Sequence, residues 1–255
     1  MLISTNAIIL KTIPYGESSI IFRIFTEDYG KVSIMAKGVR KPKQPLGLFL
    51  EPMNHIYLQY YHKNTREIQI LKDAGLIHQY SVLRSKLDTI IIGQSIVEAL
   101  DKSTLENNSL PILYRLAWRV LDKINCADVN LWAVFAFYLY QLSLRLGFMP
   151  NLKTCYQCKS VFEHALINDQ TGELMCYDCN PYGKLAVNKG GLIFLQKLEN
   201  MHLDEINSEV NDSSEIFNAL SFLKIFTCIH LNGIVNMRSL EIMQKCLNNN
   251  ELDNL

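Results

Sequence analysis

Residues 18–41 read SSIIFRIFTEDYGKVSIMAKGVRK and contain two alternating segments joined by a turn that ends in glycine. In the first segment, residues 18–26, every second side chain from Ile20 to Ile24 is apolar, and residues 31–37 repeat the pattern. Successive side chains of a strand point to opposite faces, so a period of two indicates a strand with one buried face. We therefore expect two strands joined by a tight turn.

Working outward from this pair, three further short segments show β-rich composition or alternation, at residues 7–13, 54–61 and 65–73. Gly and Pro punctuate the connections between them. Five short strands within the first 75 residues predict a small barrel, and the five-stranded Greek-key OB-fold fits that count. Periodicity alone does not separate the OB-fold from another small β-barrel.

The second strand leads into GVRKPKQP at residues 38–45, a loop by its Gly and Pro content with a dense run of positive charge. Barrels of this kind bind single-stranded nucleic acid with a cationic groove for phosphates and aromatic faces for bases. The candidate cations, called the basic loop below, are Lys37, Arg40, Lys41 and Lys43. Arg23 and Lys31 extend this charge on the predicted outward faces of the two strands. Candidate stacking residues are Tyr57, Tyr61 and Phe49. A second interpretation is a solvated hairpin whose lysines keep a sheet edge soluble.

From about residue 85 the apolar period changes from two to near 3.6, which predicts helices for the rest of the chain. The expected helices span residues 87–100, 111–124, 129–146, 190–201, 213–231 and 239–247. The third is the most apolar and should form the core of the helical part. The sequence thus predicts an α+β protein of two domains: a barrel domain over residues 1–80 and a helical domain over residues 81–255.

Four cysteines form the most specific chemical signal: Cys155, Cys158, Cys176 and Cys179, spaced as C-x-x-C, seventeen residues, C-x-x-C. This spacing is typical of a zinc ribbon or finger. Chance pairing and disulfides are the alternatives. A shell of four thiolates leaves no position for water or substrate, so the expected ion is a structural Zn²⁺. An insertion at about residues 150–182 would hold it. His164 is not expected to be a ligand, because the four thiolates already complete the tetrahedron.

Charge distribution and sequence motifs limit the classes of function that the chain could have. The formal net charge is zero, but residues 1–80 carry ten Lys and Arg against six Asp and Glu, and residues 199–255 carry three against nine. The first eighteen residues do not resemble a signal peptide, and no apolar stretch is long enough to span a bilayer, so we expect a cytoplasmic protein without membrane contact. Motifs for nucleotide binding, hydrolase elbows and zinc proteases are absent, and no nucleophile has partners, which disfavours an enzyme.

Several motifs resemble the bacterial recombination mediator family RecO. They are Tyr15-Gly16-Glu17-Ser18, Phe25-Thr26, Tyr29-Gly30-Lys31, Ala36-Lys37-Gly38-Val39-Arg40-Lys41, Gly147-Phe148-Met149-Pro150-Asn151-Leu152 before the first cysteine pair, His230-Leu231 and Arg238-Ser239-Leu240. The likeness covers essentially the whole chain. It implies an N-terminal OB-fold joined to a helical domain that carries the zinc segment.

The resemblance also implies a function without covalent chemistry. Members of the family bind single- and double-stranded DNA, anneal complementary strands and, with RecR, help RecA displace single-stranded DNA-binding protein. The helical domain is expected to receive the acidic and hydrophobic C-terminal tail of that protein. Two alternatives stay open: an RNA-binding OB-fold module with a structural zinc site, and a zinc-dependent enzyme with a vacant metal position.

Overall fold

A computed structural model describes the chain over residues 1–41, 45–126, 128–183, 185–210 and 214–231. Lys43 of the basic loop and the helix predicted at residues 239–247 lie outside these ranges. Contacts divide the chain into two compact units, Met1–Asn125 and Cys126–Leu255. No helix among the described residues is both long and apolar enough to cross a bilayer.

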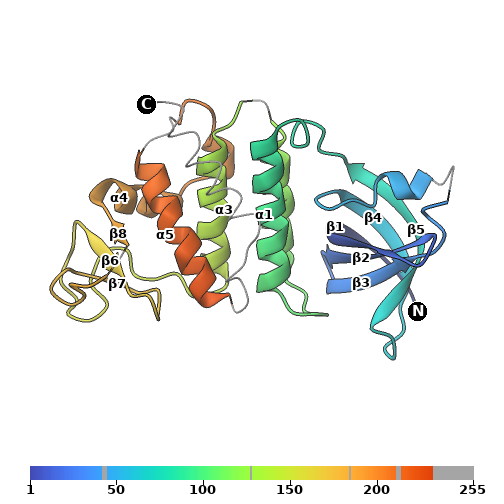
Figure 1. Ribbon diagram of the computed structural model, residues 1–255, viewed down its shortest axis with the longest axis horizontal. Helices are drawn as coiled ribbons and strands as arrows, with labels where there is room; N and C mark the ends of the chain where they lie inside the picture. The colour runs from blue at the N-terminus through green and yellow to red at the C-terminus, as the bar shows by residue number, and fades with distance from the viewer. Residues whose placement is uncertain (42–44, 127, 184, 211–213, 232–255) are drawn as a thin grey trace. The chain divides into compact units, whose positions relative to one another are not determined.

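The first unit opens with five strands that close into a barrel (Figure 1). They are β1 (Leu2–Tyr15), β2 (Ser19–Thr26), β3 (Gly30–Ala36), β4 (His55–Tyr61) and β5 (Ile68–His78), with a 3-10 helix, η1 (Pro45–Leu48), between β3 and β4. Neighbours follow the order β1-β2-β3-β5-β4, and β4 pairs with β1 again to close the barrel. Only the β3–β5 pair is parallel among the five. The five-stranded OB-fold barrel predicted from the strand count is confirmed.

The barrel core follows from the alternation in the sequence. Phe22 and Ile24 of β2 and Ile34 of β3 are fully buried inside the barrel, as expected when one face of each strand is apolar. Ile8 and Phe25 are also fully buried but do not belong to this core. Part of the outer barrel surface is therefore covered.

The cover comes from two helices, α1 (Leu87–Ser103) and α2 (Pro111–Ile124), which both contact β1. Their connection runs along the start of β3, where the Asn107 N–H donates to the Lys31 carbonyl at 3.0 Å. Gly30 has φ of 68°, and a Cβ on it would overlap the backbone of Asn108. This position therefore requires glycine for both its conformation and the close approach of the connection.

The second unit contains α3 (Leu131–Arg145), α4 (Lys189–Leu198), the 3-10 helix η2 (Leu203–Glu205) and α5 (Ser214–His230). Eleven residues of α3 are buried, and it packs against α4 and α5, so an apolar helix forms the core as predicted. Between α3 and α4 the chain forms a small sheet in the order β7-β6-β8, from β6 (Ala165–Ile167), β7 (Leu174–Met175) and β8 (Ala186–Val187). β8 contacts α5.

The contact division falls after Asn125, and the domain boundary after residue 80 stays a prediction. The change of period marks where strands give way to helices, but α1 and α2 make compact contacts with the barrel and are grouped with it. The described helices otherwise follow the predicted ones closely. The bounds of α2 match at both ends, with Pro111 at the first helical position, where its missing N–H costs nothing.

Candidate metal centre and nucleic-acid interface

The first cysteine pair lies in a tight turn after α3. The Cys155 N–H donates to the Ser160 carbonyl at 2.9 Å, and the Lys159 N–H donates back to the Cys155 carbonyl at 3.0 Å. Lys159 has a positive φ of 63°, a conformation that is uncommon outside glycine. The turn bends the chain so that Cys155 and Cys158 can present their sulfurs to one point.

The second cysteine pair follows β7 and forms a similar turn. The Cys179 and Asn180 N–H groups both donate to the Cys176 carbonyl, at 3.2 Å and 3.0 Å. The Asn180 side chain in turn donates to the carbonyl of Ile167 in β6 at 3.1 Å. The small sheet therefore anchors this turn.

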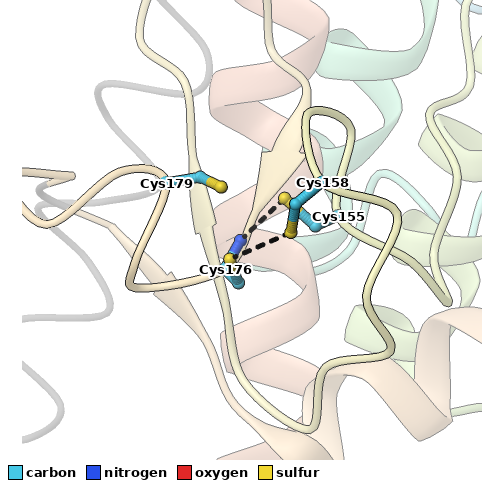
Figure 2. A group of neighbouring side chains, drawn as sticks. All are labelled: Cys155, Cys158, Cys176 and Cys179. Atoms are coloured by element: carbon cyan, nitrogen blue, oxygen red, sulfur yellow. Dashed lines mark hydrogen bonds between the residues drawn. The ribbon is translucent and has the colours of Figure 1, made fainter.

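The structure brings all four cysteines together, as the spacing predicted (Figure 2). Their Sγ atoms lie within 4.8 Å of one another, and those of Cys158 and Cys176 are 3.6 Å apart. Sulfurs in a disulfide are about 2.05 Å apart, so these two are not bonded. Four sulfurs around Zn²⁺, each at about 2.3 Å, would have edges of about 3.8 Å, which is close to this arrangement. Among the described residues no other group of His, Cys, Asp or Glu forms such a cluster.

The environment of the sulfurs stabilises thiolates unevenly. Burial raises the pKa of Cys155, but N–H donors from the backbone of Cys158, Cys176 and Gln157 outweigh burial and bring the pKa to about 6. The hydroxyl of Ser160, 3.0 Å from the sulfur of Cys158, lowers the pKa of that thiol. A hydrogen bond with Cys176 raises the pKa of Cys179 to about 12. Metal binding requires thiolates, so a bound ion would lower the pKa of each coordinating thiol.

The four sulfurs are a donor set that fits a soft or borderline divalent metal, with every position of a tetrahedron filled by protein. Cys155 is fully buried, whereas Cys158 is exposed. A closed shell has no place for a reacting water. The arrangement can therefore join two turns of the chain but offers no catalytic position.

The basic loop begins where β3 ends. Lys37, Arg40 and Lys41 are exposed, and a turn is closed by the Lys41 N–H, which donates to the Gly38 carbonyl at 3.2 Å. The Arg40 N–H donates to the Ser18 carbonyl at 2.9 Å, which fixes the loop beside the β1–β2 turn. Within the described ranges no acidic side chain pairs with these three cations.

The structure contradicts one expectation, which concerns the availability of Lys31. The alternation placed it on the outward face of its strand as a candidate DNA-binding residue, but its side chain is only 9% exposed. Its Nζ donates to the carbonyls of Asp101 and Thr104, at 2.5 Å and 2.7 Å, and lies 3.2 Å from the Asp101 carboxylate. These carbonyls lie at the end of α1, where backbone acceptors lack helical partners and the helix dipole favours a cation. Lys31 thus fastens α1 to the barrel, and its ammonium is not available to a ligand.

Arg23 is paired with acidic residues but remains partly exposed. Its guanidinium contacts Asp101 at 3.3 Å and Glu106 at 3.7 Å, and its side chain remains 40% exposed. Sequence reasoning identified neither acidic partner, because both follow in the chain only after the barrel is complete.

The predicted stacking residues also differ in how accessible their rings are. Tyr57 and Tyr61 of β4 are 42% and 49% exposed, whereas Phe49 is partly buried and packs against the barrel core. An aromatic ring can stack on a base only if its face is accessible. Tyr57 and Tyr61 meet that condition.

Comparison with known proteins covers both parts of the chain. Residues 1–80 match the family model "Recombination protein O N terminal", and residues 84–227 match "Recombination protein O C terminal". A protein of Salinibacter ruber named DNA repair protein RecO is 36% identical over 149 residues, which span 58% of this chain and 57% of that protein. Proteins of the same name from Pelodictyon phaeoclathratiforme and Chloroherpeton thalassium are 29% and 28% identical, over 97% and 96% of this chain and 99% of each relative.

Proposed function

The chain belongs to the recombination protein O family, RecO, and we propose that it binds and anneals single-stranded DNA and helps RecA replace single-stranded DNA-binding protein during recombinational repair. The observation that supports this most is the set of cations at Lys37, Arg40 and Lys41, exposed beside a closed OB-fold barrel and without an acidic partner in the described parts of the chain. Such cations are available to phosphates.

Annealing follows from phosphate binding without base recognition. Two complementary strands repel each other through their phosphates, and a cationic surface lowers that repulsion while the bases remain free to choose their partners. No bond is made or broken by the protein, so no catalytic residue is required. This is the physical reason for proposing a mediator rather than an enzyme.

The partners follow from family membership. We expect contacts with single- and double-stranded DNA, with RecR, and with the C-terminal tail of single-stranded DNA-binding protein, together with a functional link to RecA. The helical part of the chain is the expected receptor for the tail.

The four cysteines are assigned a structural Zn²⁺. Their sulfurs converge within 4.8 Å, and zinc prefers a tetrahedron of thiolates. When bound, the ion joins the turn after α3 to the turn after β7, so its binding free energy adds to the stability of the folded segment.

Salt dependence tests the assignment of the phosphate-binding residues. Each phosphate contact on single-stranded DNA contributes about 0.7 to the slope of log affinity against log salt concentration. The triple variant Lys37→Ala, Arg40→Ala, Lys41→Ala should therefore bind an oligo-dT more weakly and with a slope smaller by about two. The matched control removes three exposed lysines elsewhere, Lys86→Ala, Lys153→Ala, Lys197→Ala, with the same change in charge. Equal slopes for the triple variant and the wild type would refute the assignment.

Strand annealing tests the activity itself. The wild type should accelerate pairing of complementary DNA strands, both when they are free and when they are coated with single-stranded DNA-binding protein. An RNA strand of the same sequence should compete no better than DNA, because a phosphate-tracking surface does not read the 2′-hydroxyl. Preferential binding of RNA would favour the alternative of an RNA-binding module.

A further inference from the structure

The outer face of β1, β2 and β3 has an open end that the helices do not bury. Strand register places Ile13 opposite Ile21, and Ile21 opposite Met35. These three residues, called the apolar row, cross the three strands side by side. Ile13 is 47% exposed, and Ile21 and Met35 are half-buried.

The apolar row points away from the barrel core. Ile20 and Phe22, which flank Ile21 in the chain, are core residues, as are Ile34 and Ala36, which flank Met35. Adjacent side chains of a strand point to opposite faces, so Ile21 and Met35 lie on the outer face. An apolar row left open on a sheet needs a reason, because soluble proteins expose few contiguous apolar patches.

Tyr15 continues this surface along β1. It lies two residues beyond Ile13, so both side chains share the outer face, and it is 53% exposed. Side chains two apart on a strand are separated by about 6.6 Å. Tyr15 therefore supplies an aromatic ring next to the apolar row.

Cations lie on two sides of this surface. On one side Lys11 is exposed and pairs in register with Arg23. On the other side Lys37 follows directly after the last residue of β3, and Arg40 donates to the carbonyls of Ser18 and Gly16 in the turn after Tyr15. The exposed acidic residue in that turn is Glu17. An apolar and aromatic strip bordered by positive charge is complementary to a nucleic acid strand, whose bases are apolar on their faces and whose phosphates are anionic.

We propose that Tyr15 and the apolar row are a base-contacting surface, on which the bases of single-stranded DNA lie while the phosphates follow Lys11, Lys37 and Arg40. This rests on the proposed function. Contact through base faces explains how the barrel can hold a strand in extended form without sequence preference, because every base has an apolar face. The surface adds affinity for bases that the basic loop alone does not supply.

An abasic oligonucleotide separates base contacts from phosphate contacts. It keeps every phosphate but has no bases. The wild type should bind an oligo-dT about tenfold more tightly than its abasic counterpart, because a base stacked on an aromatic ring adds to the affinity. The variant Ile13→Ser, Tyr15→Ala should lose this preference for intact DNA while binding the abasic strand as the wild type does.

The control variant is Ile193→Ser, Tyr182→Ala, which makes the same two changes at exposed residues outside the barrel. It should keep the wild-type preference, and its thermal unfolding and that of Ile13→Ser, Tyr15→Ala should match the wild type. An unchanged preference in Ile13→Ser, Tyr15→Ala, or a preference lost in Ile193→Ser, Tyr182→Ala instead, would overturn the proposal. A wild type that binds neither oligonucleotide would refute the proposed function as a whole, so the two failures are distinguishable.

Discussion

The cysteine segment and the basic loop are both short clusters of chemically similar side chains, but their groups are satisfied in different ways. The four sulfurs face one another within 4.8 Å. Lys37 and Lys41 instead extend into solvent without an acidic partner in the part of the chain that the structure describes. Groups satisfied by one another hold the fold, and groups without an internal partner are available to a ligand.

Like the cysteines, Lys31 is satisfied by groups within the fold, although its charge suggested that it was available to a ligand. Its ammonium is bound by the end of α1, so its contribution goes to the folded state. Arg23 lies between the two classes, because it is paired and still 40% exposed.

Removal of the proposed structural Zn²⁺ should have the largest effect, and this effect should be on stability. Structural zinc contributes on the order of 10 kcal/mol in small zinc-binding peptides. Cys176→Ser should therefore lose zinc and lose the protection of amides in β6, β7 and β8 from hydrogen exchange. Binding of single-stranded DNA should remain. Cys126→Ser, which changes a cysteine outside the cluster, is the control. A large loss of DNA affinity in folded Cys176→Ser would place the cysteine segment in the binding surface.

Replacement of Lys31 should have the second-largest effect. Lys31→Met removes a buried cation from Asp101 and from two carbonyls, which should destabilise the protein by about 3 kcal/mol. Lys37→Met, six residues along the same stretch, should change the free energy of unfolding by less than about 0.5 kcal/mol. Denaturant unfolding of both variants checks this. Equal effects would remove the distinction between the two lysines.

Low pH should reduce the stability of the barrel unit, because this unit contains a buried histidine. Burial, followed by the nearby His78, lowers the pKa of His55 from 6.5 to about 4. Between these values the unfolded chain binds more protons, so stability is fully present above pH 6.5 and is lost as the pH falls toward 4, by about 3 kcal/mol. His55→Gln should flatten this dependence in denaturant unfolding between pH 4 and 7, and His62→Gln should not. A wild-type stability that does not change over this range would contradict the burial of a neutral His55.

The smallest effect is expected at Arg23. Glu106→Gln removes a carboxylate 3.7 Å from the guanidinium, and exposed pairs of this kind contribute about 0–1 kcal/mol to stability. The variant should therefore keep its stability and bind single-stranded DNA about twofold more tightly, because Arg23 gains freedom to meet a phosphate. Glu98→Gln, which changes the same charge on α1, is the control. Unchanged affinity in Glu106→Gln would mean that DNA does not reach Arg23.

The sequence predicted the barrel, the helices and the cysteine cluster because each has a short-range pattern. Apolar alternation defines β2 and β3, Pro111 sets the start of α2, and the C-x-x-C spacing brings pairs of sulfurs together. The strands β6, β7 and β8 have two or three residues each, too few for a period to be recognised.

The burial of Lys31 could not be predicted, because its partner Asp101 lies seventy residues away in the chain. The apolar row was missed for a related reason. Ile13, Ile21 and Met35 each resemble ordinary strand residues, and only strand register places them side by side. Local periodicity thus identifies elements, whereas the partners of individual side chains depend on the fold.

Photo-cross-linking of single-stranded DNA would show which part of the chain binds the DNA, because it locates the DNA without changing the protein. An oligo-dT carrying photoreactive thymines would be bound to the full chain and irradiated, and the linked peptides would be identified by mass spectrometry. We expect cross-links within residues 11–41 of the barrel. Cross-links confined to residues 150–182 would contradict it and would assign the DNA to the cysteine segment.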